Sequence, residues 1–162
     1  GLAFAVAAGM WWIYFDITAS SSQRELAEAE EEAEDVATDQ RHDLFVYGHL
    51  PLTLGIVLAG VGLEELAVHP EVGAPSAAAW VLASGVATFL VGVALVIGGT
   101  TRTLRAVWPW PMAGIPLVLA GALVPFPGAL LLTGAYAVAV LALAAHGTVA
   151  SRRSDTVLAG AD

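Results

Sequence analysis

Apolar residues gather in five blocks along the chain, and short segments rich in polar residues, glycine or proline separate these blocks. A helix needs about 20 residues, at roughly 1.5 Å each, to cross a bilayer core about 30 Å thick. Blocks of this length class are typical of membrane spans and are longer than the core helices of a soluble domain. The pattern predicts an all-α fold, a polytopic transmembrane helix bundle in a single membrane domain (1–162), with spans at about residues 1–17, 44–68, 76–99, 108–124 and 129–150.

The block 44–68 carries ionisable side chains inside a span. His49 lies about one turn from its start, and Glu64 lies about one turn from its end. Such groups are costly in a spanning helix, so they usually face a protein interior. Pro51 has no N–H, which predicts a helix kink near His49 and a freed carbonyl one turn back. Pro116 predicts a second break, in the span 108–124.

Glycines recur at seven-residue intervals in three of the spans. A seam of small residues lets another helix approach closely, so the pattern indicates helix packing more strongly than it indicates a ligand site. The candidate packing positions are Gly48, Gly55, Gly62, Gly85 and Gly92.

Aromatic residues cluster near the ends of two spans. Tryptophan and tyrosine are enriched where a membrane meets water, so these clusters predict interfacial belts. Asp16 directly follows the first belt, and it is either a plain charge at a helix end in water or a member of a polar site. The predicted interfacial aromatics are Trp11, Trp12, Tyr14, Trp108 and Trp110.

The polar segments predict the orientation. Residues 20–43 read as an acidic surface helix that can run straight into the next span, and the acidic run 28–35 reads as a solvated face or as a cation or partner site. The five-span arrangement places every arginine on one side, which the positive-inside rule assigns to the cytoplasm. The acidic helix and the C-terminal tail are therefore expected to be cytoplasmic. The arginines are Arg24, Arg41, Arg102, Arg105, Arg152 and Arg153.

Composition excludes several classes of function. The chain is 57% hydrophobic and 13% charged, with a mean hydropathy of +0.75, and it contains no cysteine. Disulfide and thiol chemistry are therefore excluded, and six cationic residues give no basic patch for nucleic acid. The four histidines are scattered along the chain, so no metal-ligand spacing is present, and the motifs of soluble enzymes are absent. We expect no metal site, no cofactor and no nucleic-acid partner.

The motifs W-W-I-Y-F-D at residues 11–16 and H-L-P at residues 49–51 precede G-I at 55–56, G-L-E at 62–64 and H-P at 69–70. This combination resembles the bacterial low temperature requirement A family. The resemblance implies a multi-pass protein of the bacterial plasma membrane that is linked to growth in the cold. It also implies that the chain corresponds to the C-terminal half of a longer protein, whose upstream spans would be its partners together with the lipid bilayer.

Three functions remain open. Intramembrane His49 and Glu64, together with the helix breaks, favour a transporter or a proton- or ion-linked pathway. The acidic segment favours a non-transporting scaffold or sensor. A membrane-embedded enzyme, which is the least favoured, would have to use Asp16, His49 and Glu64. These three residues are the candidate polar site. Asp16 is expected near His49 at the cytoplasmic end, where the two side chains can pair, and Glu64 is expected near the outer end, on the same helix face as His49. The substrate is not predicted.

Overall fold

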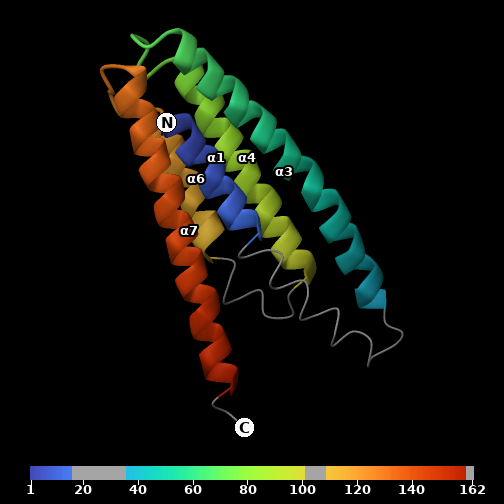
Figure 1. Cartoon of the computed structure of the whole chain (residues 1–162). Coiled ribbons are helices and arrows are strands. Elements are labelled where there is room, and N and C mark those ends of the chain that lie inside the picture. Colours follow the sequence, from blue (N-terminus) through green and yellow to red (C-terminus); the bar gives the residue numbers. More distant parts are fainter. Residues whose placement is uncertain (16–35, 101–108, 160–162) are drawn as a thin grey trace.

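In the part of the chain that the structure describes, five α helices run side by side along the long axis of the molecule (Figure 1). The computed structural model describes the backbone of residues 1–15, 36–100 and 109–159, and the side chains of residues 1–15, 46–97 and 110–149. The predicted all-α class is confirmed. The helices are α1 (Leu2–Trp12), α3 (Val36–Val68), α4 (Ala77–Thr100), α6 (Pro109–Gly121) and α7 (Ala129–Ala159).

Three of the helices contain segments long and apolar enough to cross a membrane: Val46–Val68, Ala77–Ile97 and Ala129–Val149. The apolar segments Leu2–Phe15 and Trp110–Gly121 are shorter. Helix α6 ends before the predicted residue 124, because the proline-rich residues 122–128 form a turn. These lengths and this composition make the chain a membrane protein with a bundle of about five spans.

Helix α3 is longer than the predicted span. It begins at Val36, so the last part of the predicted acidic helix is continuous with the span, while residues 20–35 of that prediction lie outside the described residues. The helix continues through Pro51, which has no N–H to donate to the carbonyl of Tyr47. Helix α7 likewise continues to Ala159, beyond the predicted residue 150.

The contact between α3 and α4 is built on glycines from each helix. The Cβ of an alanine at Gly62 would lie 2.6 Å from the backbone nitrogen of Leu82, and one at Gly48 would lie 2.9 Å from Val96 Cγ2. Gly55, Gly85 and Gly92 likewise lie against the backbone of the other helix, beside Phe89, Ala59 and Leu52 respectively. The seven-residue interval therefore keeps one face of each antiparallel helix against the other along most of its length.

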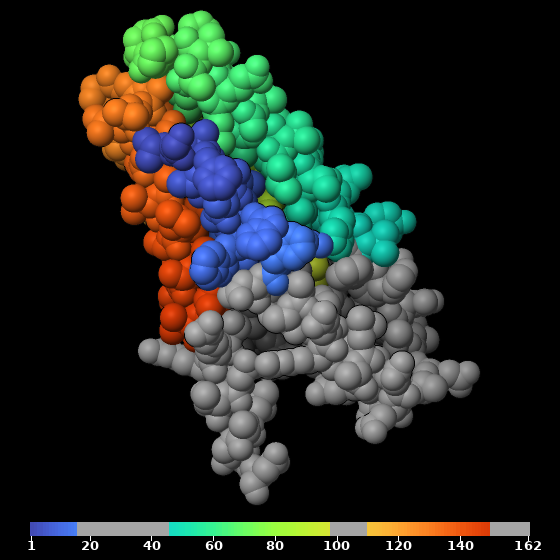
Figure 2. Space-filling model, viewed as in Figure 1, coloured from blue at the N-terminus to red at the C-terminus, as the bar shows by residue number. Residues whose placement is uncertain are grey.

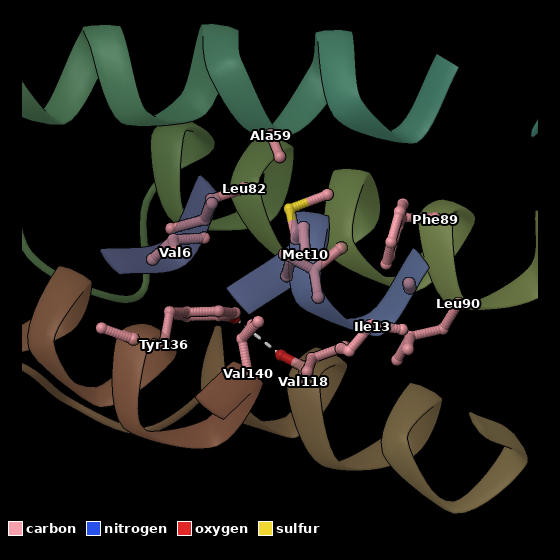
Figure 3. Close-up of a cluster of buried hydrophobic side chains, with 14 of the residues drawn as sticks. Val6, Met10, Ile13, Ala59, Leu82, Phe89, Leu90, Val118, Tyr136 and Val140 are labelled. Atoms are coloured by element: carbon pink, nitrogen blue, oxygen red, sulfur yellow. Dashed lines mark hydrogen bonds between the residues drawn. The ribbon is translucent and has the colours of Figure 1, made fainter. Parts of the chain in front are cut away.

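Helix α1 lies between two helical hairpins, α3–α4 and α6–α7. Figure 3 shows its buried side chains Val6, Met10 and Ile13 between the two. Its close contact with α7 depends on Gly9, where an added Cβ would lie 2.7 Å from Val140 Cγ1. Because α1 is enclosed on several sides, the rotation of α1 about its own axis is fixed.

The turns of the two hairpins are joined by backbone hydrogen bonds at one end of the bundle, which we call the turn end. Ala74 and Phe126 form an antiparallel pair, with N···O distances of 3.1 and 3.2 Å. Ala129 N–H also donates to the carbonyl of Pro70 at 3.1 Å. Ser76 caps α4 by accepting a hydrogen bond from Ala79 N–H at 3.1 Å. The opposite end of the bundle is called the His49 end.

Candidate functional site

The candidate site lies where the last turn of α1 meets α3, near the His49 end. Tyr14 Oη and His49 Nε2 lie 3.1 Å apart and form a hydrogen bond. The two rings meet edge to face, with centroids 6.0 Å apart and planes inclined by 82°. Each side chain is half-buried. The pair thus connects two helices through polar atoms at the margin of an apolar bundle.

The last turn of α1 directs Tyr14 inwards. Residues 13–15 form a wider, π-helical turn, a local geometry that is frequent at functional sites. Ile13 is fully buried and anchors this turn in the core, while Trp11 and Phe15 remain exposed, with ring centroids 5.0 Å apart. Figure 2 shows α1 on the visible face of the molecule, between α3 and α7. The aromatic segment is therefore divided: Trp11 and Phe15 face outwards and Tyr14 faces the protein.

The α3 side of the site is shaped by Gly48, Pro51 and Thr53. Gly48 is buried against α4 beside Val96, so the neighbouring His49 leaves that contact and lies toward α1. Thr53 Oγ1 donates to the carbonyls of His49, at 2.9 Å, and of Leu50, at 3.0 Å. These are bonds from a side chain back to the carbonyls of its own helix, and they involve the turn that carries His49.

Either partner of the Tyr14–His49 hydrogen bond can be the donor. When His49 Nε2 carries no proton, the Tyr14 hydroxyl donates to it; when Nε2 carries a proton, Nε2–H donates to the phenol oxygen. Imidazole is the side chain that most readily exchanges protons at physiological pH. The pair can consequently keep its hydrogen bond through a change of protonation.

Glu64 does not join this pair. Fifteen residues separate it from His49, which corresponds to about 22 Å of helix rise. Its side chain is exposed on the side of α3 that faces away from α4, among exposed apolar residues such as Val57, Val61 and Val68. Near the turn end, the neighbouring Glu65 forms an ion pair with His69, with Oε1 and Nδ1 3.1 Å apart. The structure thus separates the two candidate groups of α3 along the bundle.

The remaining sequence candidates divide into three cases. Asp16 and Trp108 lie outside the described residues, so the pairing of Asp16 with His49 stays a prediction. Trp11 and Trp12 are exposed, as residues facing lipid or an interface would be. Trp110 is only 5% exposed and lies in the core near the start of α6, and its interfacial position stays a prediction. Among the described residues no group of three or more histidine, aspartate or glutamate side chains is placed to hold a metal ion.

Tyr14 is the residue whose place in the site the sequence did not reveal. It was grouped with the interfacial tryptophans because it belongs to the same aromatic segment. Its position three residues after Trp11, and next to the apolar Ile13, gave no sign of which way the ring faces. The signal available in the sequence was its membership of the W-W-I-Y-F-D motif.

Comparison with known proteins identifies the family. A model of the family described as "Bacterial low temperature requirement A protein (LtrA)" matches residues 1–149. The chain belongs to the low temperature requirement A family. Within this LtrA chain, the matched region includes α1, α3, α4 and α6 and most of α7. It therefore includes the Tyr14–His49 pair.

One relative of the LtrA chain is a protein of Rhizobium meliloti (strain 1021), described as "Uncharacterized protein RA0937". The two are 41% identical over 61 residues, which is 38% of this chain and 14% of the relative. The LtrA chain thus matches only a small part of that protein's length. No solved structure matches the chain.

Proposed function

We propose that this protein takes part in proton-linked transport across the bacterial plasma membrane, with His49 as the group that exchanges protons. The observation that carries the proposal is the Tyr14–His49 hydrogen bond between two helices. An ionisable side chain in a membrane helix is a functional candidate by default, and here it has a partner that can donate or accept. The substrate class is left open, and support of growth in the cold follows from the family description alone.

The orientation belongs to the proposal. All six arginines lie in segments that follow the first, third and fifth spans, so the His49 end faces the cytoplasm by the positive-inside rule. The acidic segment and the C-terminal tail would then be cytoplasmic. His49 would exchange protons with that compartment. Asp16 follows Tyr14, the partner of His49, by two residues in the sequence.

Glu64 is proposed as a second protonatable position near the outer end. An exposed carboxyl on an apolar helix face is costly in lipid, so we expect this face to lie against protein. The upstream spans of the longer protein are the partners we propose for this face. A proton relay across the membrane needs protonatable groups near both ends of the path, with polar groups between them. His49 and Glu64 would be the two end groups on α3.

A non-transporting scaffold or sensor is the second candidate. The observation that favours it is the outer face of α3, where Leu50, Leu54 and Val57 are 70%, 49% and 61% exposed. Such a face can hold another membrane protein without moving any solute. Both candidates are binding or transport functions, and we propose no enzymatic reaction for the chain.

The deciding experiment measures proton flux. The full-length protein is reconstituted in liposomes with an internal pH-sensitive dye, and a proton gradient is imposed across the membrane. We expect His49→Gln to abolish protein-dependent flux. Tyr14→Phe should slow it up to about tenfold, the equivalent of one hydrogen bond. Folding is checked by elution from a sizing column.

The matched control is His146→Gln. His146 is an exposed histidine on α7, so the same substitution there should leave flux unchanged. Equal flux in the wild type, His49→Gln and protein-free liposomes would exclude proton-linked transport. In that case, retention of a cold-growth phenotype by His49→Gln cells would favour the scaffold.

A further inference from the structure

A buried donor near the start of α6 has no partner. The side chain of Trp110 is 5% exposed, and its indole Nε1–H is buried without a hydrogen-bond partner in the described protein. An indole nitrogen is a donor only, so another N–H group cannot satisfy it. Buried polar groups are nearly always paired, and an apparent exception usually marks the place of a bound water or ligand.

Trp110 lies at the same depth in the bundle as His49. One turn further along α6, Gly114 lies against Leu90 of α4 and Leu143 of α7. Helices α6 and α4 are antiparallel, so one turn back from Gly114 on α6 corresponds to one turn forward from Leu90 on α4. Trp110 therefore lies at about the depth of Ala94. His49 follows Gly48, which lies against Leu95 and Val96 of the same helix. The unpaired donor and the proposed proton-exchanging histidine are therefore both beside the last turns of α4.

The start of α6 favours a neutral oxygen over an anion. A helix N-terminus binds anions through several free backbone N–H groups. Pro109 and Pro111 flank Trp110 and supply none, so two of the first four backbone N–H groups of the helix are missing here. Ala94 and Ile97, two residues of α4 near this depth, are apolar and buried. One indole N–H in apolar surroundings cannot compensate a buried negative charge, so the acceptor that fits here is a single uncharged oxygen.

We propose that Trp110 Nε1–H donates to the oxygen of a buried water molecule at the His49 end of the bundle. Helix α7 offers a hydroxyl at this level, because Leu143 lies opposite Gly114 and the buried Thr148 follows about one turn later. The site brings water to the depth of His49 but does not depend on transport. Its failure would leave the Tyr14–His49 proposal standing.

The test is solid-state NMR of the full-length protein in liposomes, with ¹⁵N in the indole nitrogens. Trp110→Phe identifies the Trp110 signal by its loss, and Trp80→Phe identifies a reference ring that is 42% exposed at the other end of α4. If Trp110→Phe does not accumulate, tryptophan labelled uniformly with ¹³C and ¹⁵N is combined with carbonyl-¹³C proline. The Pro109 carbonyl then selects the backbone amide of Trp110, because residues 1–162 contain one Pro–Trp dipeptide, and correlations within that residue lead from the amide to the indole nitrogen. Magnetisation is then transferred from water to the indole protons.

A hydrogen-bonded proton shift for Trp110 with rapid transfer from water is the expected result. An unbonded shift without transfer would overturn the proposal, since the donor would then be unpaired. A hydrogen-bonded shift without transfer from water would overturn it as well, because the acceptor would not be water.

Discussion

Two tyrosine hydroxyls connect helices that are distant in the sequence. Tyr14 reaches His49 from α1 to α3, and Tyr136 of α7 donates to the carbonyl of Val118 in α6 at 2.6 Å. Val118 belongs to the last turn of α6, where carbonyls lack the helical N–H donor four residues later. For Val118 that donor would be Ala122 N–H, which instead donates to the carbonyl of Leu119. The phenol of Tyr136 thus satisfies a buried carbonyl at the end of α6 (Figure 3).

Tyr136→Phe should reduce stability. The substitution leaves the Val118 carbonyl unpaired in an apolar setting, which costs about 1–3 kcal/mol of the free energy of unfolding. Thermal unfolding in detergent measures the loss. Tyr47→Phe is the matched control, because Tyr47 is 70% exposed, and its midpoint should stay within error of the wild type. Equal midpoints for all three proteins would show that the Tyr136 bond contributes nothing.

At this scale the sequence predicted which residues are polar but not which of them meet. His49 stood out because an imidazole within an apolar block is unusual. The direction of Tyr14 depends on how α1 is rotated between the two hairpins, and that rotation is fixed by non-local contacts such as Gly9 with Val140. No local pattern contains this information. The same reason explains why Trp110 lies in the core.

Glycine spacing organises the helices as elements. On α3 the glycines face α4, except Gly60, where an added Cβ would meet no atom within 4 Å. On α4, Gly85 and Gly92 complete the same contact. The seven-residue period is visible in the sequence, but the pairing of each glycine with its opposite residue depends on the length of the turn between the helices. The end of α6 is likewise local, since Pro125 and Pro127 prevent helix there.

Gly55→Ala and Gly60→Ala form a matched pair in one helix. At Gly55 the new Cβ would meet the backbone of Phe89 and would lie 2.7 Å from the carbonyl oxygen of Gly85, so the helices must separate. We expect a loss of about 1–3 kcal/mol and a lower yield. At Gly60 the methyl has open space, and the higher helix propensity of alanine should keep or slightly raise the midpoint. The measurement is thermal unfolding in detergent.

Equal effects of the two substitutions would contradict the observed packing of α3 on α4. A loss at Gly60 alone would mean that another helix occupies the outer face of α3 in the purified protein.

For the whole molecule, hydropathy alone predicted the membrane class, and the motifs predicted the family. The number of helices followed from the apolar blocks, although α1 and α6 are shorter than the spans expected. The bond between the two turns was not predictable, because Ala74 and Phe126 pair through backbone atoms that any residues could provide. The side of the membrane on which the turn end lies stays a prediction from arginine placement.

Reporter fusions test that arrangement in the full-length protein. Fusions after Val72 and after Val124 should report the same compartment, because these two turns are joined to each other. A fusion after Arg153 should report the opposite compartment, the cytoplasm. A cytoplasmic signal from the Val124 fusion would reject the proposed orientation, and matching compartments for the Val124 and Arg153 fusions would reject the five-span arrangement.

If the two hairpins rock against each other, the joined turns are the point about which they pivot. The two hairpins share backbone hydrogen bonds at one extremity, and His49 lies nineteen residues before the end of α3, a lever arm of about 29 Å. Over that arm, each degree of rocking between the hairpins displaces the far tip by about 0.5 Å. A rotation of a few degrees would be enough to lengthen the Tyr14–His49 hydrogen bond beyond hydrogen-bond distance, while the turn end stays in place.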